Sequence, residues 1–246
     1  MSRLSKIAPT PPDDFKKNKY KELTEELTEE LSELQNLLYA EGKHSLLIVL
    51  QGMDAAGKDG AIKKVFSGVN PMGCRVKPFK KPTEREMAHD FLWRVHQHVP
   101  QQGMIQIFNR SHYEDVLIQR VHQWVDMDTI KRRYDYINSF ERLLQENGTH
   151  ILKFYLHISQ EEQHERLSER LKMRHKMWKY NPGDMKESER WDEYMEAYED
   201  VFEYCSPEIP WTIVPANKNW FKEYTIANSI VELLRSLNME YPSLNK

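Results

Sequence analysis

Residues 52–60, GMDAAGKDG, combine the residue types of a phosphate-binding loop with two carboxylates that such loops do not ordinarily carry. The usual spacing is Gly, four residues, Gly, Lys and then Ser or Thr, whose hydroxyl holds a magnesium ion. Here Asp59 stands in the hydroxyl position and Asp54 lies within the loop. Glycines let backbone amides turn toward an anion, and the lysine adds a full positive charge. We therefore expect a phosphate group to contact Gly52, Ala55, Ala56, Gly57, Lys58 and Asp59.

Asp54 needs a counter-charge, because a carboxylate repels a phosphate oxygen by about 4 kcal/mol at contact distance when the effective dielectric constant is near 20. A Mg²⁺ ion between the two groups is attracted to both, and carboxylate and phosphate oxygens are its usual ligands. Orienting an acceptor phosphate, or taking up its proton, is the alternative role. Asp59 fits a cap at the start of the next helix better than a metal site. The sequence thus predicts Asp54 as the metal ligand.

The segment NRSHYED, residues 109–115, follows a short apolar run and adds more groups suited to phosphate. The guanidinium of Arg110 offers a planar fork that matches phosphate oxygens, with pairing to Glu114 as the structural alternative. Many phosphate-loop proteins hold magnesium with an Asp at the position of Asn109. An amide carries no charge, so Asp54 is expected to take over that role. His112 lacks a partner histidine at metal-ligand spacing, and we expect it to be packed.

Arg166, Arg170 and Arg174 recur every four residues and are expected to share one face of a helix over residues 160–180. A row of guanidinium groups can neutralise the charge that spreads over a transferring phosphoryl group. The NPGD sequence that follows predicts a turn able to act as a hinge. Residues from about 160 to 190 are therefore expected to form a lid over the site. A solvated helix held by arginine–glutamate pairs is the alternative.

Residues 58–81 hold seven bases and one acid, whereas residues 22–41 hold seven acids and no base. A positive field directly after a phosphate loop favours a polyanionic ligand, and a solvated basic face is the alternative. Apart from Lys58, the bases are Lys63, Lys64, Arg75, Lys77, Lys80 and Lys81. Phe79 is a candidate for flanking a nucleobase. Thr83 has the spacing to Glu86 of a capping box, which starts a helix.

The elements that must position these residues alternate regularly between strand and helix patterns. Five short β-like runs are predicted, at Leu46–Gln51, Arg75–Phe79, Met104–Phe108, Ile151–His157 and Trp211–Val214. Helical patterns cover 13–41, 58–68, 83–98, 112–123, 127–146, 160–180, 186–204 and 218–238. Such alternation indicates a parallel sheet in one three-layer α/β domain spanning 1–246. Residues 1–12 are expected to form a mobile arm, and the leucine stripe of residues 13–41 to pack on the domain.

Composition points to a protein that works in solution inside the cell. The chain of 246 residues is 39% hydrophobic and 30% charged, with a net charge of −3. We find no apolar run that could cross a membrane and no secretory signal, and the two cysteines lack metal-ligand spacing. We therefore expect a cytoplasmic protein that binds neither membranes nor nucleic acid.

Taken together, GMDAAGKDG, NRSHYED and the segment KYNPGD followed by RWDEYMEAYED resemble the polyphosphate kinase type 2 family over residues 13 to 240. The resemblance implies a P-loop kinase fold like that of thymidylate kinase, with a helical lid. It implies Mg²⁺-dependent transfer of a terminal phosphoryl group between polyphosphate and nucleotides, with Mn²⁺ as a substitute ion, and a homodimer or homotetramer.

The same resemblance implies roles for single residues. Asp54 would bind the metal, Lys58 would hold phosphate, and Arg110 and Arg170 would lie at the reacting phosphates. The basic segment, together with Arg174, would line a path for the polyanion. The nucleotide would meet Phe79, Thr83, Asn109, Arg110, Glu114 and Asp184. Asn109 and Glu114 depart from the diphosphate-specific branch and resemble the branch that accepts both AMP and ADP, giving ADP and ATP.

Two other functions remain open at this point. An ATP-dependent nucleoside monophosphate kinase would share the fold, but it ordinarily carries Ser or Thr after the loop lysine. A phosphate-loop domain that binds nucleotide as a switch, without catalysis, would not need the arginine row or the acidic loop.

Overall fold

The computed structural model describes residues 4–205 and 207–244, and its centre is a five-stranded parallel sheet. The strand order is β2-β3-β1-β4-β5. Their bounds are β1 Ser45–Gln51, β2 Cys74–Pro78, β3 Ile105–Asn109, β4 Thr149–His157 and β5 Trp211–Pro215. Strand β1 is central because it pairs with β3 on one side and β4 on the other. The predicted parallel sheet is confirmed, with each strand within two residues of its expected bounds.

Strand β1 forms because its residues are apolar and can be covered on both faces. All seven of its residues are buried. Leu46, Ile48 and Leu50 face one hydrophobic cluster, and Leu47 and Val49 face the other. Each such side chain contributes roughly 1.5–3 kcal/mol relative to an exposed one. The strand is therefore a rigid support for the loop that follows it.

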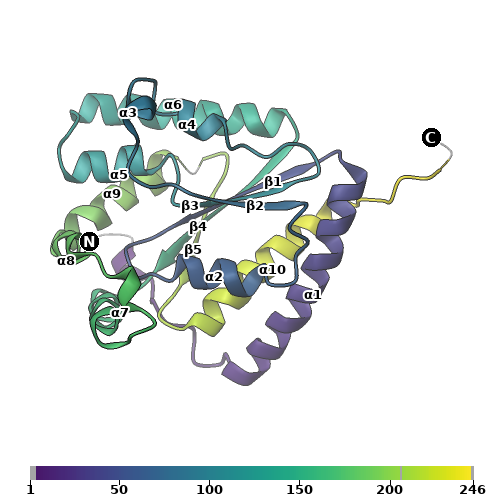
Figure 1. Ribbon diagram of the computed structural model, residues 1–246, viewed down its shortest axis with the longest axis horizontal. Coiled ribbons are helices and arrows are strands. Elements are labelled where there is room, and N and C mark those ends of the chain that lie inside the picture. Colours follow the sequence, from purple (N-terminus) through teal and green to yellow (C-terminus); the bar gives the residue numbers. More distant parts are fainter. Residues whose placement is uncertain (1–3, 206, 245–246) are drawn as a thin grey trace.

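Two helical layers cover the sheet, which confirms the three-layer α/β fold (Figure 1). One layer holds α1 (Lys17–Glu41), α2 (Lys58–Val65) and α10 (Asn219–Ser236), and the other holds α5 (Glu114–Val121), α6 (Met127–Glu146) and α9 (Trp191–Tyr204). The leucine stripe of α1 packs on the domain as expected, with Leu27, Leu31 and Leu38 buried and α10 as its neighbour. The short helix α4 (Trp93–His96) lies beside α6, where the ring centroids of His96 and Phe140 are 5.6 Å apart, and α3 (Glu84–Met87) precedes it in the chain.

The prediction of one helix over residues 160–180 is wrong in its second half. Helix α7 spans Gln160–Lys172, and Met173 is extended, with φ −98° and ψ 112°. A 3-10 helix, η2 (Met177–Lys179), and α8 (Pro182–Ser188) follow. The NPGD sequence starts α8 instead of forming a hinge turn, because the Asn181 side chain accepts a hydrogen bond from Gly183 N at 3.1 Å and proline suits the first helical turn.

The helix expected over 83–98 is likewise two helices. Asp90 Oδ1 accepts hydrogen bonds from the backbone N–H groups of Leu92 and Trp93, both at 3.0 Å. The Asp90 side chain thus closes a turn over residues 90–93 that separates the two helices.

The arm expected over residues 1–12 is not detached from the fold in its described part. Leu4 is only 1% exposed and belongs to a core cluster, within the 3-10 helix η1 (Leu4–Lys6). The carbonyl of Ile7 lies 3.0 Å from His157 Nε2, and Pro9 O accepts from Asn217 N at 3.0 Å. Residues 1–3 lie outside the described residues. The expected helix from residue 13 begins only at Lys17.

Candidate active site

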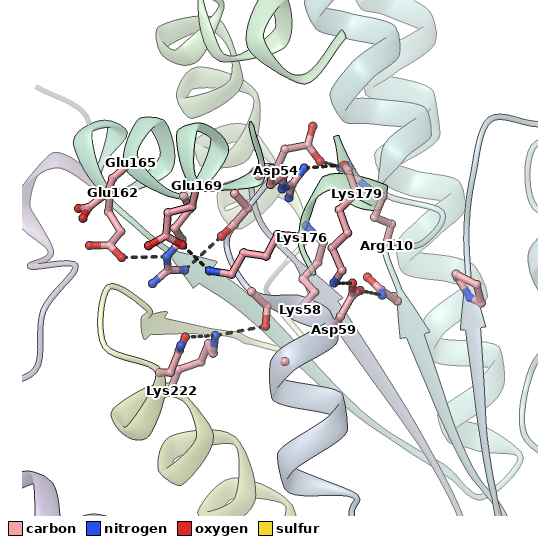
Figure 2. Close-up of a pocket in the computed structure, with 18 of the residues that line it drawn as sticks. Asp54, Lys58, Asp59, Arg110, Glu162, Glu165, Glu169, Lys176, Lys179 and Lys222 are labelled. Carbon is pink, nitrogen blue, oxygen red and sulfur yellow. Dashed lines mark hydrogen bonds and ion pairs between the residues drawn. The ribbon is translucent and has the colours of Figure 1, made fainter. Parts of the chain in front are cut away.

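A cavity of about 800 Å³ lies at the carboxyl end of the sheet, where parallel sheets ordinarily bind ligands. Its walls are the phosphate loop, the segments that follow β2 and β3, helix α7, the segment 173–181 and the start of α10 (Figure 2). We call 173–181, the part of the expected 160–190 lid that lies between α7 and α8, the lid segment; its closure over substrate stays a prediction.

Two glycines give the phosphate loop a shape that other residues would not allow. Gly52 has φ 147°, and a Cβ there would lie 2.9 Å from the carbonyl oxygen of Leu156. Gly57 has φ 92°, and a Cβ there would overlap Lys222 Nζ. Gly57 is also the N-cap of α2 and supplies no side-chain acceptor. The first N–H groups of α2 are thus left for an anion.

Lys58 is folded back over the loop in a buried position. Its Nζ donates to the carbonyl oxygens of Gly52 at 2.7 Å and Met53 at 3.1 Å. Burial, with the nearby Arg110 guanidinium adding to it, lowers the pKa of Lys58 to about 8. The ammonium is therefore close to losing its proton in the physiological range, and a bound anion would stabilise the charged form.

Asp54, Arg110 and Glu114 form a charged row near Lys58. Figure 2 shows the Asp54 and Arg110 members of this row. Arg110 pairs with Asp54 and also with Glu114 at 3.1 Å, so the alternative expected for it from sequence is present as well. Burial acts to raise the pKa of Asp54, but Arg110, Lys58 and Arg170 outweigh it and hold that pKa below its ordinary value. Asp54 is thus ionised, and its counter-charge in this structure is Arg110. Glu114 does not line the cavity.

Arg110 is held in a strained backbone conformation, with φ 60°. Non-glycine residues at such angles cost about 1–3 kcal/mol and persist only where the surroundings impose them. Here the Arg110 N–H donates to Leu50 O at 3.0 Å, and its side chain is held by Asp54 and Glu114. A separate buried network joins Tyr113 to Glu141. Glu141 accepts from Tyr113 Oη at 2.8 Å and from Lys153 Nζ at 2.7 Å, and His112 Nε2 lies 3.2 Å away. His112 is therefore packed and hydrogen-bonded, as expected.

Asp59 does not cap helix α2, so that expectation is wrong. Its Oδ1 accepts a hydrogen bond from Asn109 Nδ2 at 2.8 Å, and its Oδ2 accepts from Lys179 Nζ at 2.6 Å. The amide of Asn109 is directed at Asp59. Both residues line the cavity.

The three arginines expected on one helix face have three different surroundings. Arg166 pairs with Glu162 at 2.8 Å and donates to the carbonyls of Ala55, Ala56, Ala216 and Asn217 at 2.9 to 3.2 Å. It therefore fastens the helix to the phosphate loop. Arg170 lines the cavity and pairs with Asp184 at 2.6 Å. Arg174 follows the end of α7, is exposed and lies outside the cavity lining, which contradicts the row expected from sequence.

The basic segment expected to line a polyanion path is only partly at the cavity. Lys80 lines it, whereas Lys63, Lys64, Arg75, Lys77 and Lys81 do not. For these five, a place along a polyanion path outside the cavity stays a prediction. Lys64 instead lies 3.6 Å from Glu25.

Sequence reasoning missed three lysines of the cavity, Lys176, Lys179 and Lys222. The basic run MRHKMWK, residues 173–179, was a signal for the first two. No pattern in the sequence pointed to Lys222, since it lies in a largely apolar helix, α10. Its Nζ is buried and donates to Asn219 Oδ1 at 2.9 Å and Gly57 O at 3.2 Å.

The expected nucleotide residues are not gathered in one place. Phe79 touches the cavity but is only 3% exposed, and its ring packs edge-on against Phe108 with centroids 4.9 Å apart. Thr83 forms the predicted capping box with Glu86 and does not line the cavity. Asp184 is paired with Arg170 and also lies outside the lining.

Asp54 is the residue best suited to hold a divalent cation. Its carboxylate is ionised and borders the cavity, and such oxygens are preferred ligands of Mg²⁺. Within residues 4–205 and 207–244 no group of three His, Cys, Asp or Glu side chains could hold an ion by itself. The residues thus fit an ion shared between Asp54 and the phosphate oxygens of a substrate.

No helix in the described part of the chain is long and apolar enough to cross a membrane.

Comparisons with known proteins agree with this geometry. The model of the family described as Polyphosphate kinase 2 (PPK2) matches residues 14–243. An AMP/ADP-polyphosphate phosphotransferase of Meiothermus ruber is 54% identical over 211 residues, which cover 85% of this chain and 79% of that protein. An ADP-polyphosphate phosphotransferase of Rhodopseudomonas palustris is 43% identical, with coverage of 95% and 86%. The crystal structure of Polyphosphate Kinase 2 from Arthrobacter aurescens TC1 superposes with a TM-score of 0.95 at 42% identity, over 99% of this chain and 88% of that one. The chain therefore belongs to the Polyphosphate kinase 2 (PPK2) family.

Proposed function

We propose that this protein transfers a terminal phosphoryl group from inorganic polyphosphate to AMP and to ADP, and that the reaction is reversible. The observation that carries the proposal is the cavity itself, in which the phosphate loop meets basic side chains from several other elements. These side chains are Lys80, Arg110, Arg166, Arg170, Lys176, Lys179 and Lys222. Counting Lys58, the lining holds eight lysines and arginines against five carboxylates, and this excess of positive charge around one phosphate loop suits a polyanionic donor as well as a nucleotide.

In the proposed reaction, an oxygen of the nucleotide's terminal phosphate attacks the end phosphorus of polyphosphate. The bond from that phosphorus to the bridging oxygen breaks, and the shortened chain leaves with the electron pair. Lys58, Arg110 and Arg170 stabilise the charge on the transferring group, and positioning accounts for most of the remaining rate enhancement. No covalent intermediate on the protein is needed.

A divalent cation completes the proposed site. Asp54 would hold Mg²⁺, or Mn²⁺ in its place, and the ion would neutralise phosphate charge during transfer. Arg110 must then share Asp54 with the ion or turn toward the substrate phosphates. Asn109 is directed at Asp59 and is not needed as a ligand.

The acceptor range rests on two supports. Asn109 and Glu114 occur in the NRSHYED form, and the Meiothermus ruber relative is named for both AMP and ADP. We further propose a cytoplasmic location, where both acceptors are present, and a homodimer or homotetramer.

The test is to incubate the protein with Mg²⁺, AMP and long-chain polyphosphate, without ATP, and to follow the nucleotides by chromatography. ADP should appear first and ATP after a lag. A parallel reaction with ATP as donor and no polyphosphate is the comparison. Absence of product with polyphosphate, together with AMP turnover by ATP, would overturn the proposal in favour of an ATP-dependent nucleoside monophosphate kinase.

A further inference from the structure

Asp59 joins three separate parts of the cavity wall, although it is the residue that departs most from an ordinary phosphate loop. It lies in the first turn of α2, directly after Lys58. One carboxylate oxygen is held by Asn109, 50 residues away at the end of β3, and the other by Lys179, 120 residues away in the lid segment. Figure 2 shows Asp59 and Lys179 pointing toward each other across the cavity wall.

The pair with Asp59 is the side-chain polar link between the lid segment and the phosphate loop. The other polar side-chain contacts of residues 173–181, among those of the described chain, stay within α7, α8 and the segment itself. Lys176 pairs with Glu169, Trp178 Nε1 donates to His175 O at 3.1 Å, and Asn181 Nδ2 donates to Asp184 at 2.9 Å. The fastening of this segment to the phosphate loop therefore depends strongly on one ion pair.

We infer that Asp59 is a positioning residue that holds the lid segment over the phosphate loop through its ion pair with Lys179. This inference rests on the proposed function only for the identity of the substrate under the lid. In ordinary phosphate loops the hydroxyl at this position serves the metal ion. Here the position serves the lid, while Asn109 fixes the direction of the carboxylate. The lysine also neutralises a negative charge that would otherwise repel phosphate at the cavity wall.

The protonation state of Asp59 supports this arrangement. Partial burial acts to raise its pKa, but the hydrogen bonds from Lys179 and Asn109 and the charges of Lys179 and Lys58 hold the pKa below its ordinary value. The carboxylate is thus charged across the neutral range, and the ion pair with Lys179 needs no particular pH.

Hydrogen exchange of the whole protein without substrates, read by mass spectrometry over residues 173–181, tests this role of Asp59. Asp59→Asn should speed exchange of this segment roughly twofold to fivefold, as expected for the loss of one partly exposed ion pair. Lys179→Met should do the same, and the double variant should add little to either single change. Lys179→Arg, which keeps the pair, should exchange like the wild type.

The matched control is Glu30→Gln. Glu30 lies on α1, away from the cavity, and its carboxylate pairs with Arg235 of α10. This substitution should leave exchange of 173–181 unchanged. In kinetics, Asp59→Asn should lower kcat/KM by a similar factor of about twofold to fivefold, and exchange elsewhere in the protein should not become faster.

Unchanged exchange of the segment in both Asp59→Asn and Lys179→Met would overturn the inference, as would full additivity in the double variant. The exchange result does not depend on turnover, so failure of the polyphosphate assay would leave this test valid.

Discussion

At the scale of single residues, Asp54 is central because its ionised carboxylate lies in the phosphate loop and borders the cavity, with Arg110 as its counter-charge. Asp54→Asn keeps the size of the side chain but removes the charge proposed to hold the cation. We expect turnover of polyphosphate and AMP to fall at least about 10³-fold, the scale of a lost electrostatic group in a transfer site.

Asp200→Asn is the control for this change, since Asp200 also pairs with an arginine, Arg120, at 2.5 Å but lies outside the cavity. It should keep near-wild-type turnover. Both variants should unfold cooperatively at temperatures close to the wild type. Near-wild-type turnover by folded Asp54→Asn would refute the metal role.

The lowered pKa of Lys58 leads us to expect a fall in activity at alkaline pH. Its pKa of about 8 means that the free protein carries the ammonium below that pH and loses it above. Because phosphate binding needs the charge, kcat/KM for polyphosphate should fall above pH 8 by up to about tenfold per pH unit. The measurement is initial rate at limiting polyphosphate from pH 7 to 9.5.

Lys222 shares a pKa of about 8, so the Lys222→Met variant separates the two lysines. The alkaline fall should persist in this variant because Lys58 is retained. A profile that stays flat to pH 9.5 in the wild type would contradict the role given to Lys58.

At the scale of elements, helix α7 is held to the phosphate loop by Arg166. Arg166→Met leaves four carbonyl oxygens without their donor, and we expect the free energy of unfolding to drop by about 2 kcal/mol. The KM for polyphosphate should also rise, because Ala55 and Ala56 belong to the loop. Denaturant unfolding and steady-state kinetics measure the two effects.

Arg174→Met is the matched change, since Arg174 is exposed and follows the end of the helix. It should alter the free energy of unfolding by less than about 0.5 kcal/mol. Equal effects of the two substitutions on the free energy of unfolding would contradict the different roles given to Arg166 and Arg174.

Elements were predicted well where their apolar pattern repeats over many residues. The five strands and the leucine stripe of α1 are such cases, since burial on one or two faces dictates the pattern. The break at Met173 was missed because the spacing of arginines continues past it. The break near Asp90 was missed because it depends on one side chain that closes the turn between two short helices. Local hydrogen bonds of this kind leave little trace in periodicity.

The site was predictable where a loop motif fixes the backbone, as at Gly52, Gly57 and Lys58. It was not predictable where distant elements meet. Lys222 reaches the loop from α10, 165 residues from Gly57, and Lys179 meets Asp59 from the lid segment. The charge of the basic run after the loop predicted contacts with a polyanion, yet of its six bases after Lys58 only Lys80 lines the cavity.

At the scale of the whole molecule, the N-terminal residues belong to the folded core. Leu4→Ala should lower the free energy of unfolding by about 2–4 kcal/mol, because it opens a cavity beside residues from several elements. Leu244→Ala is the control, as Leu244 is fully exposed and should change stability little. Denaturant unfolding compares them, and equal effects would mean that residues 4–9 are detached in solution.

The central claim is that the transferred phosphoryl group comes from polyphosphate. The most direct measurement uses polyphosphate labelled with ³²P, unlabelled AMP and Mg²⁺, followed by separation of the nucleotides. The account predicts label first in ADP and then in ATP, and none when Asp54→Asn replaces the wild type. Unlabelled nucleotides after prolonged incubation with active, folded protein would contradict it.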